Sequence, residues 1–190
     1  MKHIATVALM LNLGVAGVYA QERPVKMTFS GTSAASTINL QQPGTHTGED
    51  NFAGNGTLGA FTFRNVTATT ASPQSSSTCS GPNKLYFIRV AGAGVFRFQD
   101  GSLLKVNLTH GADCIDLSKP PGQGHCTLTV QINGGTGRFK DASGKLTLTE
   151  TTVPVLADAL NNPVFFAAAG KVTGMVSGVA IEADRQEEPQ

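Results

Sequence analysis

The sequence predicts an all-β protein built as a single antiparallel barrel of about eight strands. Glycine and threonine are abundant, at 22 and 21 of 190 residues. Glycine destabilises helices, and β-branched threonine fits a pleated sheet better than a helix. Apolar and polar residues also alternate along much of the chain, which is the period of a strand with one buried face. The hydrophobic content of 40% can fill a core and argues against a disordered chain.

The alternation locates the expected strands. They fall at 25–30, 58–69, 84–90, 94–98, 104–109, 126–133, 145–153 and within 164–181, with a short one near 37–41. Asp100-Gly101 lies between two of these runs and is typical of a tight hairpin. No amphipathic helix is expected.

A glycine pattern occurs twice and favours closure of the sheet. Gly92-x-Gly94-x-Phe96 recurs after 43 residues as Gly135-x-Gly137-x-Phe139. We interpret each copy as a glycine-bent strand that leads into a turn and a second strand. A repeated hairpin suits an up-and-down barrel, because closure removes the exposed sheet edges.

The first 20 residues have the layout of a secretory signal peptide. Lys2 precedes an apolar stretch over 4–18, and small residues follow it before Gln21. The stretch is shorter than the roughly 20 residues that a spanning helix needs, so we expect a secreted or periplasmic protein without a membrane anchor. The expected division is a signal peptide at 1–20, a barrel domain at 21–182 and a polar tail at 183–190.

The charge balance gives no reason to expect a nucleic-acid partner. Lysine and arginine number 14 against 13 acidic residues, a net charge of +1, and no basic run occurs. Removal of Lys2 with the signal peptide would leave an even balance. A neutral chain has no electrostatic attraction to nucleic acid or to an anionic membrane.

Three cysteines predict one disulfide and one remaining thiol in an oxidising compartment. An antiparallel pairing centred near residue 120 would set Cys114 opposite Cys126. We therefore expect the Cys114–Cys126 bond, with Cys79 bonded to either of them as the alternative.

No metal or cofactor is expected. His110 and His125 lie near the cysteines, but the spacing matches no zinc signature. Asp113 and Asp116 could contribute to a calcium site, yet two carboxylates form an incomplete shell. Hydrogen bonds that cap a loop are the simpler interpretation of these two residues.

Two polar residues are candidates for proton transfer inside the barrel. His110 is in phase with the apolar residues of 104–108, and Glu150 with those of 146–148. A desolvated carboxyl group favours its acid form, which suits general acid–base catalysis. The alternative is that both residues sit at strand ends, on a rim that is already wet.

Candidate ligand-binding residues are Phe61, Phe63, Phe87, Phe96 and Arg89. Phenylalanines can pack a small barrel solid, or they can line an apolar ligand cavity. Arg89 could meet a ligand carboxylate, or it could occupy a solvated strand position. The sequence leaves both pairs of alternatives open.

One segment resembles a known family. Gly134-Gly-Thr-Gly-Arg-Phe139, followed by Ala142-Ser-Gly144 and a threonine-rich strand, resembles a motif of the allene oxide cyclase barrel-like and dirigent-like proteins. Leu58-Gly-Ala-Phe-Thr-Phe63 and the closing glycine-rich strand are similar to secreted bacterial members of that grouping. The resemblance implies an eight-stranded barrel of the allene oxide cyclase-like type and a trimeric homo-oligomer. Family members of known activity cyclise a fatty-acid epoxide or steer phenoxy-radical coupling, and their catalytic residues match no positions here.

These observations leave three functional hypotheses. The first is a barrel that binds a small apolar ligand. The second is an isomerase or cyclase that acts by confinement in the lumen, with His110 and Glu150 as the proton-transfer groups. The third is a structural or surface-interaction module whose barrel is packed solid, and a lumen filled by phenylalanine would favour it over the other two.

Overall fold

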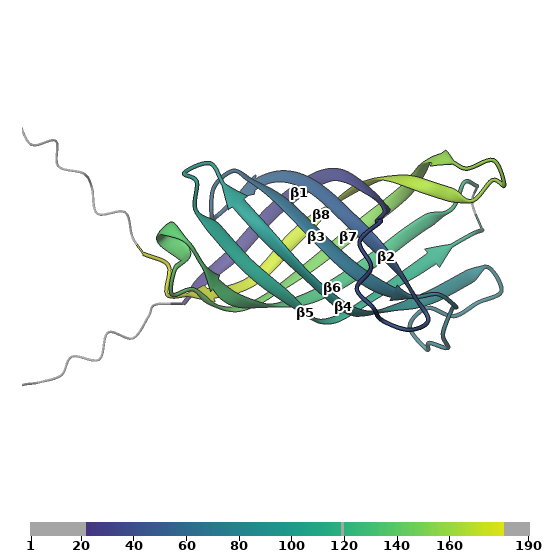
Figure 1. The fold of residues 1–190 in the computed structure, drawn as a ribbon, viewed down its shortest axis with the longest axis horizontal. Helices are drawn as coiled ribbons and strands as arrows, with labels where there is room; N and C mark the ends of the chain where they lie inside the picture. The colour runs from purple at the N-terminus through teal and green to yellow at the C-terminus, as the bar shows by residue number, and fades with distance from the viewer. Residues whose placement is uncertain (1–21, 119, 181–190) are drawn as a thin grey trace, which may run out of the picture.

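Eight long strands close into one antiparallel barrel in the computed structural model, which describes residues 22–118 and 120–180 (Figure 1). The strands are β1 (Arg23–Ala35), β2 (Thr45–Gly56), β3 (Phe61–Thr70), β4 (Lys84–Phe98), β5 (Leu103–Asp116), β6 (Gln123–Gly135), β7 (Ser143–Ala157) and β8 (Pro163–Ser177). Each strand pairs with the next, and β8 pairs with β1. The predicted fold class is therefore confirmed. The predicted signal peptide and polar tail lie outside the described residues.

Helical structure is minimal in the described part of the chain. It amounts to one 3₁₀ turn, η1 (Gly137–Phe139). No helix among these residues is long and apolar enough to cross a membrane.

Strand β2 is the element that the sequence did not predict. Its inward positions include Gly48, Gly54 and Gly56, with Asp50 buried beside Phe52. A strand whose inner face carries glycines and a carboxylate shows no apolar alternation. The expected strand near 37–41 is loop instead, and the runs 84–90 and 94–98 are parts of one strand, β4.

The two copies of the glycine pattern adopt different structures. The first lies in β4, as expected. The second runs from the end of β6 into η1, where Gly137 has a φ of +56°. Both copies do join two antiparallel strands, β4 to β5 and β6 to β7, but Gly137 lies in a 3₁₀ turn and not in a bent strand. What the copies share is packing, because Phe96 and Phe139 are both fully buried.

The half of the barrel that holds the start of β1 and the end of β8 is filled by aromatic rings. Phe63 and Phe96 stack with ring centroids 4.1 Å apart, and Phe98 lies 4.7 Å from Phe139. Arg138 covers this end, with its guanidinium carbon 4.6 Å from the Phe139 ring and 5.0 Å from the Phe98 ring. Its Nε forms an ion pair with Asp100 Oδ2 at 2.9 Å. We call this part the closed half.

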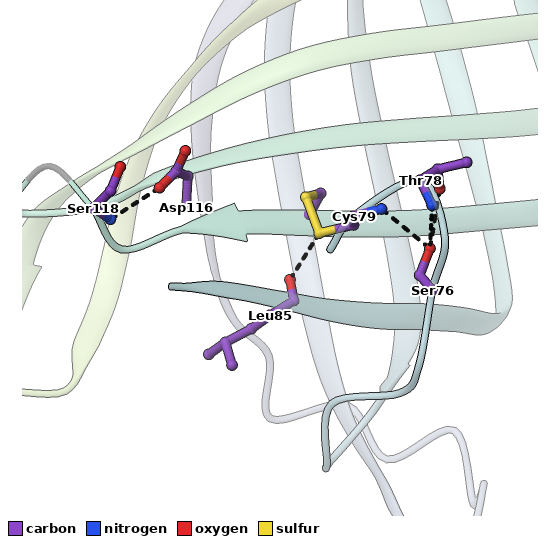
Figure 2. Close-up of a disulfide and its surroundings, with 7 residues drawn as sticks. Ser76, Thr78, Cys79, Leu85, Asp116 and Ser118 are labelled. Atoms are coloured by element: carbon purple, nitrogen blue, oxygen red, sulfur yellow. Dashed lines mark hydrogen bonds between the residues drawn. A yellow bond between two sulfur atoms is a disulfide. The ribbon is translucent and has the colours of Figure 1, made fainter. Parts of the chain in front are cut away.

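The disulfide joins Cys79 to Cys114, with their Cα atoms 5.7 Å apart, and Cys126 is a free, buried thiol (Figure 2). The predicted Cys114–Cys126 bond is therefore wrong, and the alternative involving Cys79 is correct. In the β5–β6 register, Cys114 pairs with His125, and Cys126 with Asp113. The expected pairing was off by one residue, and a shift of one residue moves a side chain to the opposite face of the sheet.

The disulfide ties the β3–β4 loop to β5. Figure 2 shows the backbone N–H of Cys79 donating to Ser76 Oγ at 3.3 Å. Asp116 Oδ1 accepts from the backbone N–H of Ser118 at 2.9 Å. This is the loop-capping role that the sequence analysis favoured for Asp116 over calcium binding.

Candidate ligand-binding cavity

A cavity of about 320 Å³ lies at the end of the barrel where β1 ends and β8 begins, which we call the open end. Apolar side chains line its walls, including Ala34, Phe87, Ile115, Val164 and Phe166. Larger hollows of about 410 and 580 Å³ lie outside the lumen. The inner cavity is the candidate site, because apolar walls and buried polar groups converge there.

The floor of the cavity is a buried polar network centred on Arg89. Its Nη1 lies 3.3 Å from Asp50 Oδ2 and donates to Thr67 Oγ1 at 3.3 Å. Its Nε and Nη2 donate to the two oxygens of Asp113 at 3.0 and 2.9 Å. Nη2 also lies 3.4 Å from Glu150 Oε1. One guanidinium group therefore faces three carboxylates.

Two β-bulges at the same height of neighbouring strands aim Arg89 and Asp113 into the barrel. In the β3–β4 pair, Ala68 faces Ala91 but Thr69 faces Arg89, so Val90 is skipped. Each bulge reverses which residues point inward.

The second bulge lies in β5 and skips Thr109 against β6. Leu104 and Val106 point inward before it, whereas Gly111 and Asp113 point inward after it. Because both strands shift together, the register between β4 and β5 is the same on either side.

The β5 bulge also decides the position of His110. Simple alternation predicted an inward side chain, but the extra residue places His110 on the exposed outer face. That orientation is a correction to the sequence analysis. His110 is absent from the cavity lining, and the structure does not bring it together with Glu150.

Glu150 points inward as expected, with its side chain 1% exposed. It pairs with Cys126 on β6, and its Oε2 is buried without a hydrogen-bond partner. Burial and the negative charge of Asp50 raise the pKa of Glu150 to about 7, although Arg89 acts in the opposite direction. Burial likewise raises the pKa of the Cys126 thiol. The catalytic role of Glu150 stays a prediction.

The predicted ligand-binding residues separate into two groups. Phe87 and Arg89 line the cavity. Phe61, Phe63 and Phe96 are buried in the closed half and do not line it. Both alternatives for the phenylalanines therefore apply, each to one half of the barrel.

The N–H groups of Arg89 point at Asp50, Asp113 and Glu150. The alternative of a solvated strand position is wrong, because the side chain of Arg89 is only 8% exposed. Its contact with a ligand carboxylate stays a prediction.

Sequence reasoning identified Glu150 but missed the other two acidic members of the network, Asp50 and Asp113. Asp50 lies in the unrecognised strand β2, in phase with Phe52. Asp113 points inward only because of the β5 bulge, whereas the sequence analysis gives it a loop-capping or calcium role. The one available signal was Asp50-x-Phe52, a carboxylate in phase with a core aromatic residue.

Comparison with known proteins gives a distant structural likeness. No family model matches the chain, and no curated protein matches it. Among solved structures, the chain is similar to one described as "Structure of the pterocarpan synthase dirigent protein GePTS1". That match has 12% identity and a TM-score of 0.37, and it covers 90% of this chain and 99% of that chain. A likeness this distant carries no residue role and no activity to this protein, and the allene oxide cyclase part of the resemblance stays a prediction.

Proposed function

We propose that this protein binds a small, largely apolar molecule in the cavity at the open end of its barrel. One observation carries the proposal: a space of about 320 Å³ combines apolar walls with a polar floor fixed by Arg89. Sites of this kind typically take the body of a ligand against apolar walls and orient it with a few polar groups. The packed side chains of the closed half lie beneath the Arg89 network, and the space on the other side of that network is open to a ligand.

Filling the cavity tests the proposal. Gly48 lines the cavity, and a Cβ atom built there would lie 3.6 Å from its nearest neighbour, the Ala34 carbonyl oxygen. Gly48→Leu should therefore fill the space without a backbone clash. Asn51→Leu, at an exposed position of the same strand, is the matched control.

Binding is measured with the neutral fluorophore N-phenyl-1-naphthylamine. We expect a saturable rise in fluorescence with the wild-type protein and with Asn51→Leu, and at least tenfold weaker binding to Gly48→Leu. Equal binding to all three proteins would place the probe on the outer surface and contradict the proposal. Native mass spectrometry of protein recovered from its own host should also find a bound small molecule that Gly48→Leu lacks.

A second candidate is an isomerase or cyclase that acts by confinement. The observation that favours it is the pKa of about 7 for Glu150, which contacts Arg89 in the floor network, since a group near neutral pH can both give and accept a proton. A bound molecule incubated with the protein in D₂O should then gain deuterium, and Glu150→Gln should abolish this gain. No incorporation with the wild-type protein would count against proton transfer.

We further propose that the protein is exported. The Cys79–Cys114 disulfide supports this, because disulfides persist in oxidising compartments. Intact-mass analysis should find a mature chain that begins at Gln21. A homotrimer, which the family resemblance implies, would be tested by sedimentation equilibrium.

A further inference from the structure

The floor of the cavity carries an excess of negative charge. Among the residues that the structure describes, Arg89 is the only lysine or arginine in the cavity lining. It faces the carboxylates of Asp50, Asp113 and Glu150. Because the side chains of Arg89, Asp50 and Glu150 are buried, such an imbalance attracts a positive group and repels a negative one.

One carboxylate oxygen of this floor is available to a ligand. Asp50 is 2% exposed and lines the cavity. Its Oδ2 meets Arg89, whereas no hydrogen bond from a described residue reaches its Oδ1. Asp113 uses both oxygens on Arg89. Asp50 Oδ1 is therefore the acceptor that a ligand donor would meet.

The excess of negative charge would be balanced better by an organic cation than by a metal ion. In the described part of the chain, no group of three or more histidine, cysteine, aspartate or glutamate side chains is placed to hold a metal. The apolar walls above the floor instead suit a hydrocarbon body. A charged nitrogen carries N–H donors for Asp50 Oδ1 and compensates the excess of carboxylates at the same time.

We propose that the cavity selects amphipathic ligands whose polar end is a cationic nitrogen, an ammonium or amidinium group, over ligands that end in a hydroxyl or a carboxylate. This inference rests on the proposed ligand-binding function and names the ligand class of that same cavity. The ligand nitrogen donates to Asp50 Oδ1, and its body lies against Phe87 and Phe166.

Binding of such a cation is coupled to the proton on Glu150. The titratable or charged groups that face Glu150 are Asp50 on β2, Arg89 on β4, Asp113 on β5 and Cys126 on β6. A cation beside Asp50 offsets the repulsion that this carboxylate exerts on Glu150, so it favours loss of the proton. Amine affinity should therefore rise as the pH rises through about 7.

Three probes with one apolar body and different ends test the inference: 1-naphthylmethylamine, 1-naphthalenemethanol and 1-naphthoate. At pH 7.5 we expect the amine to bind at least tenfold more tightly than the alcohol, and the naphthoate more weakly than both. Between pH 5.5 and pH 8 the amine affinity should rise several-fold. Calorimetry in two buffers of different ionisation enthalpy should detect the proton released.

Two isosteric variants separate the preference for the amine from the pH dependence of its binding. Asp50→Asn should abolish the preference for the amine, and Glu150→Gln should flatten the pH dependence while the preference remains. Circular dichroism shows whether each variant is folded. If either Asp50→Asn or Glu150→Gln fails to fold, the other still tests the inference. His46→Gln removes the histidine that lines the cavity and should leave the pH dependence in place.

The outcomes distinguish this inference from the proposed function. If the alcohol binds as tightly as the amine, the ligand class is wrong and the cavity still binds ligands. If Asp50→Asn keeps the preference for the amine, the contact between the ligand nitrogen and Asp50 is wrong. If neither the naphthyl probes nor N-phenyl-1-naphthylamine binds, the proposed function itself fails.

Discussion

Arg89 is the residue on which the polar floor depends. Its side chain is 8% exposed, and its guanidinium group contacts Asp50, Asp113 and Glu150. Removing one partner of a buried ion cluster leaves uncompensated charges in a medium that solvates them poorly. The network therefore fixes its own members in place, which is what a preformed ligand site requires.

Arg89→Met should lower the free energy of unfolding by about 3–5 kcal/mol, because the three carboxylates remain without their cation. Arg97→Met is the matched control, since Arg97 is exposed on the same strand, and it should change stability by less than about 1 kcal/mol. Urea unfolding at pH 7.5 measures both variants. Similar losses would show that the network contributes little.

Glu150 makes stability depend on pH in a defined direction. Its pKa is about 7 in the folded protein against 4.5 for the ordinary group, so the folded state binds its proton more tightly than the unfolded state does. The stabilising contribution of that proton is complete below about pH 4.5 and disappears as the pH rises through about 7.

The contribution is on the order of 3 kcal/mol, from about 1.4 kcal/mol for each unit of pKa. Relative to Glu150→Gln, the wild-type protein should therefore lose unfolding free energy between pH 4.5 and pH 7. Urea denaturation at pH steps across this window measures the difference. Parallel curves for the two proteins would contradict the shifted pKa.

At the scale of the element, β4 contributes to both halves of the barrel. Phe96 is 0% exposed and stacks on Phe63 in the closed half. Phe87 is half-buried and lines the cavity. The same residue type therefore serves the core at one end of the strand and the candidate site at the other.

This division predicts opposite effects for two truncations. Phe96→Ala should cost about 3–5 kcal/mol of stability, because it leaves a void in a packed core. Phe87→Ala should cost far less and weaken binding of N-phenyl-1-naphthylamine. Thermal unfolding and probe titration on both variants test this, and a large loss of stability in Phe87→Ala would contradict a preformed cavity.

The sequence predicts the structure well in regular strands and poorly in strands that contain a bulge or inward glycines. Alternation located β1, β5 and β6 and oriented Glu150 correctly, because β7 is regular around that residue. It failed at His110 and Asp113, because one extra residue in β5 reverses the two faces and leaves no mark in composition. It failed again in β2, where glycines replace the apolar residues that would have revealed an inner face.

At the scale of the whole molecule, one half of the barrel is packed solid and the other half contains the cavity. The start of β1 and the end of β8 lie at the closed end, where Arg138 covers Phe139, and the β3–β4 and β7–β8 loops lie at the other end (Figure 1). Stability and ligand binding therefore reside in different halves. The Cys79–Cys114 bond is a covalent link of the open half, since it holds the loop of residues 71–83 against β5.

That placement defines what loss of the disulfide should do. The bond spans 35 residues, and closing such a loop in the unfolded chain is worth about 4 kcal/mol on the chain-entropy model. The double variant Cys79→Ala/Cys114→Ala should lose roughly this amount of unfolding free energy. Cys126→Ala, which leaves the bond intact, should lose less, and peptide mapping of the wild-type protein should find Cys126 as the free thiol.

A sharper test is where in the barrel the loss of the disulfide acts. Without the bond, the β3–β4 loop is released at the rim of the cavity, whereas the aromatic packing of the closed half is untouched. Hydrogen exchange in the double variant should therefore accelerate in the first residues of β4 and the last residues of β5, with protection kept around Phe96 and Leu104. Probe binding should weaken in parallel. Uniform acceleration over all eight strands would instead mean that the barrel unfolds as one unit and that the open end has no separate stability.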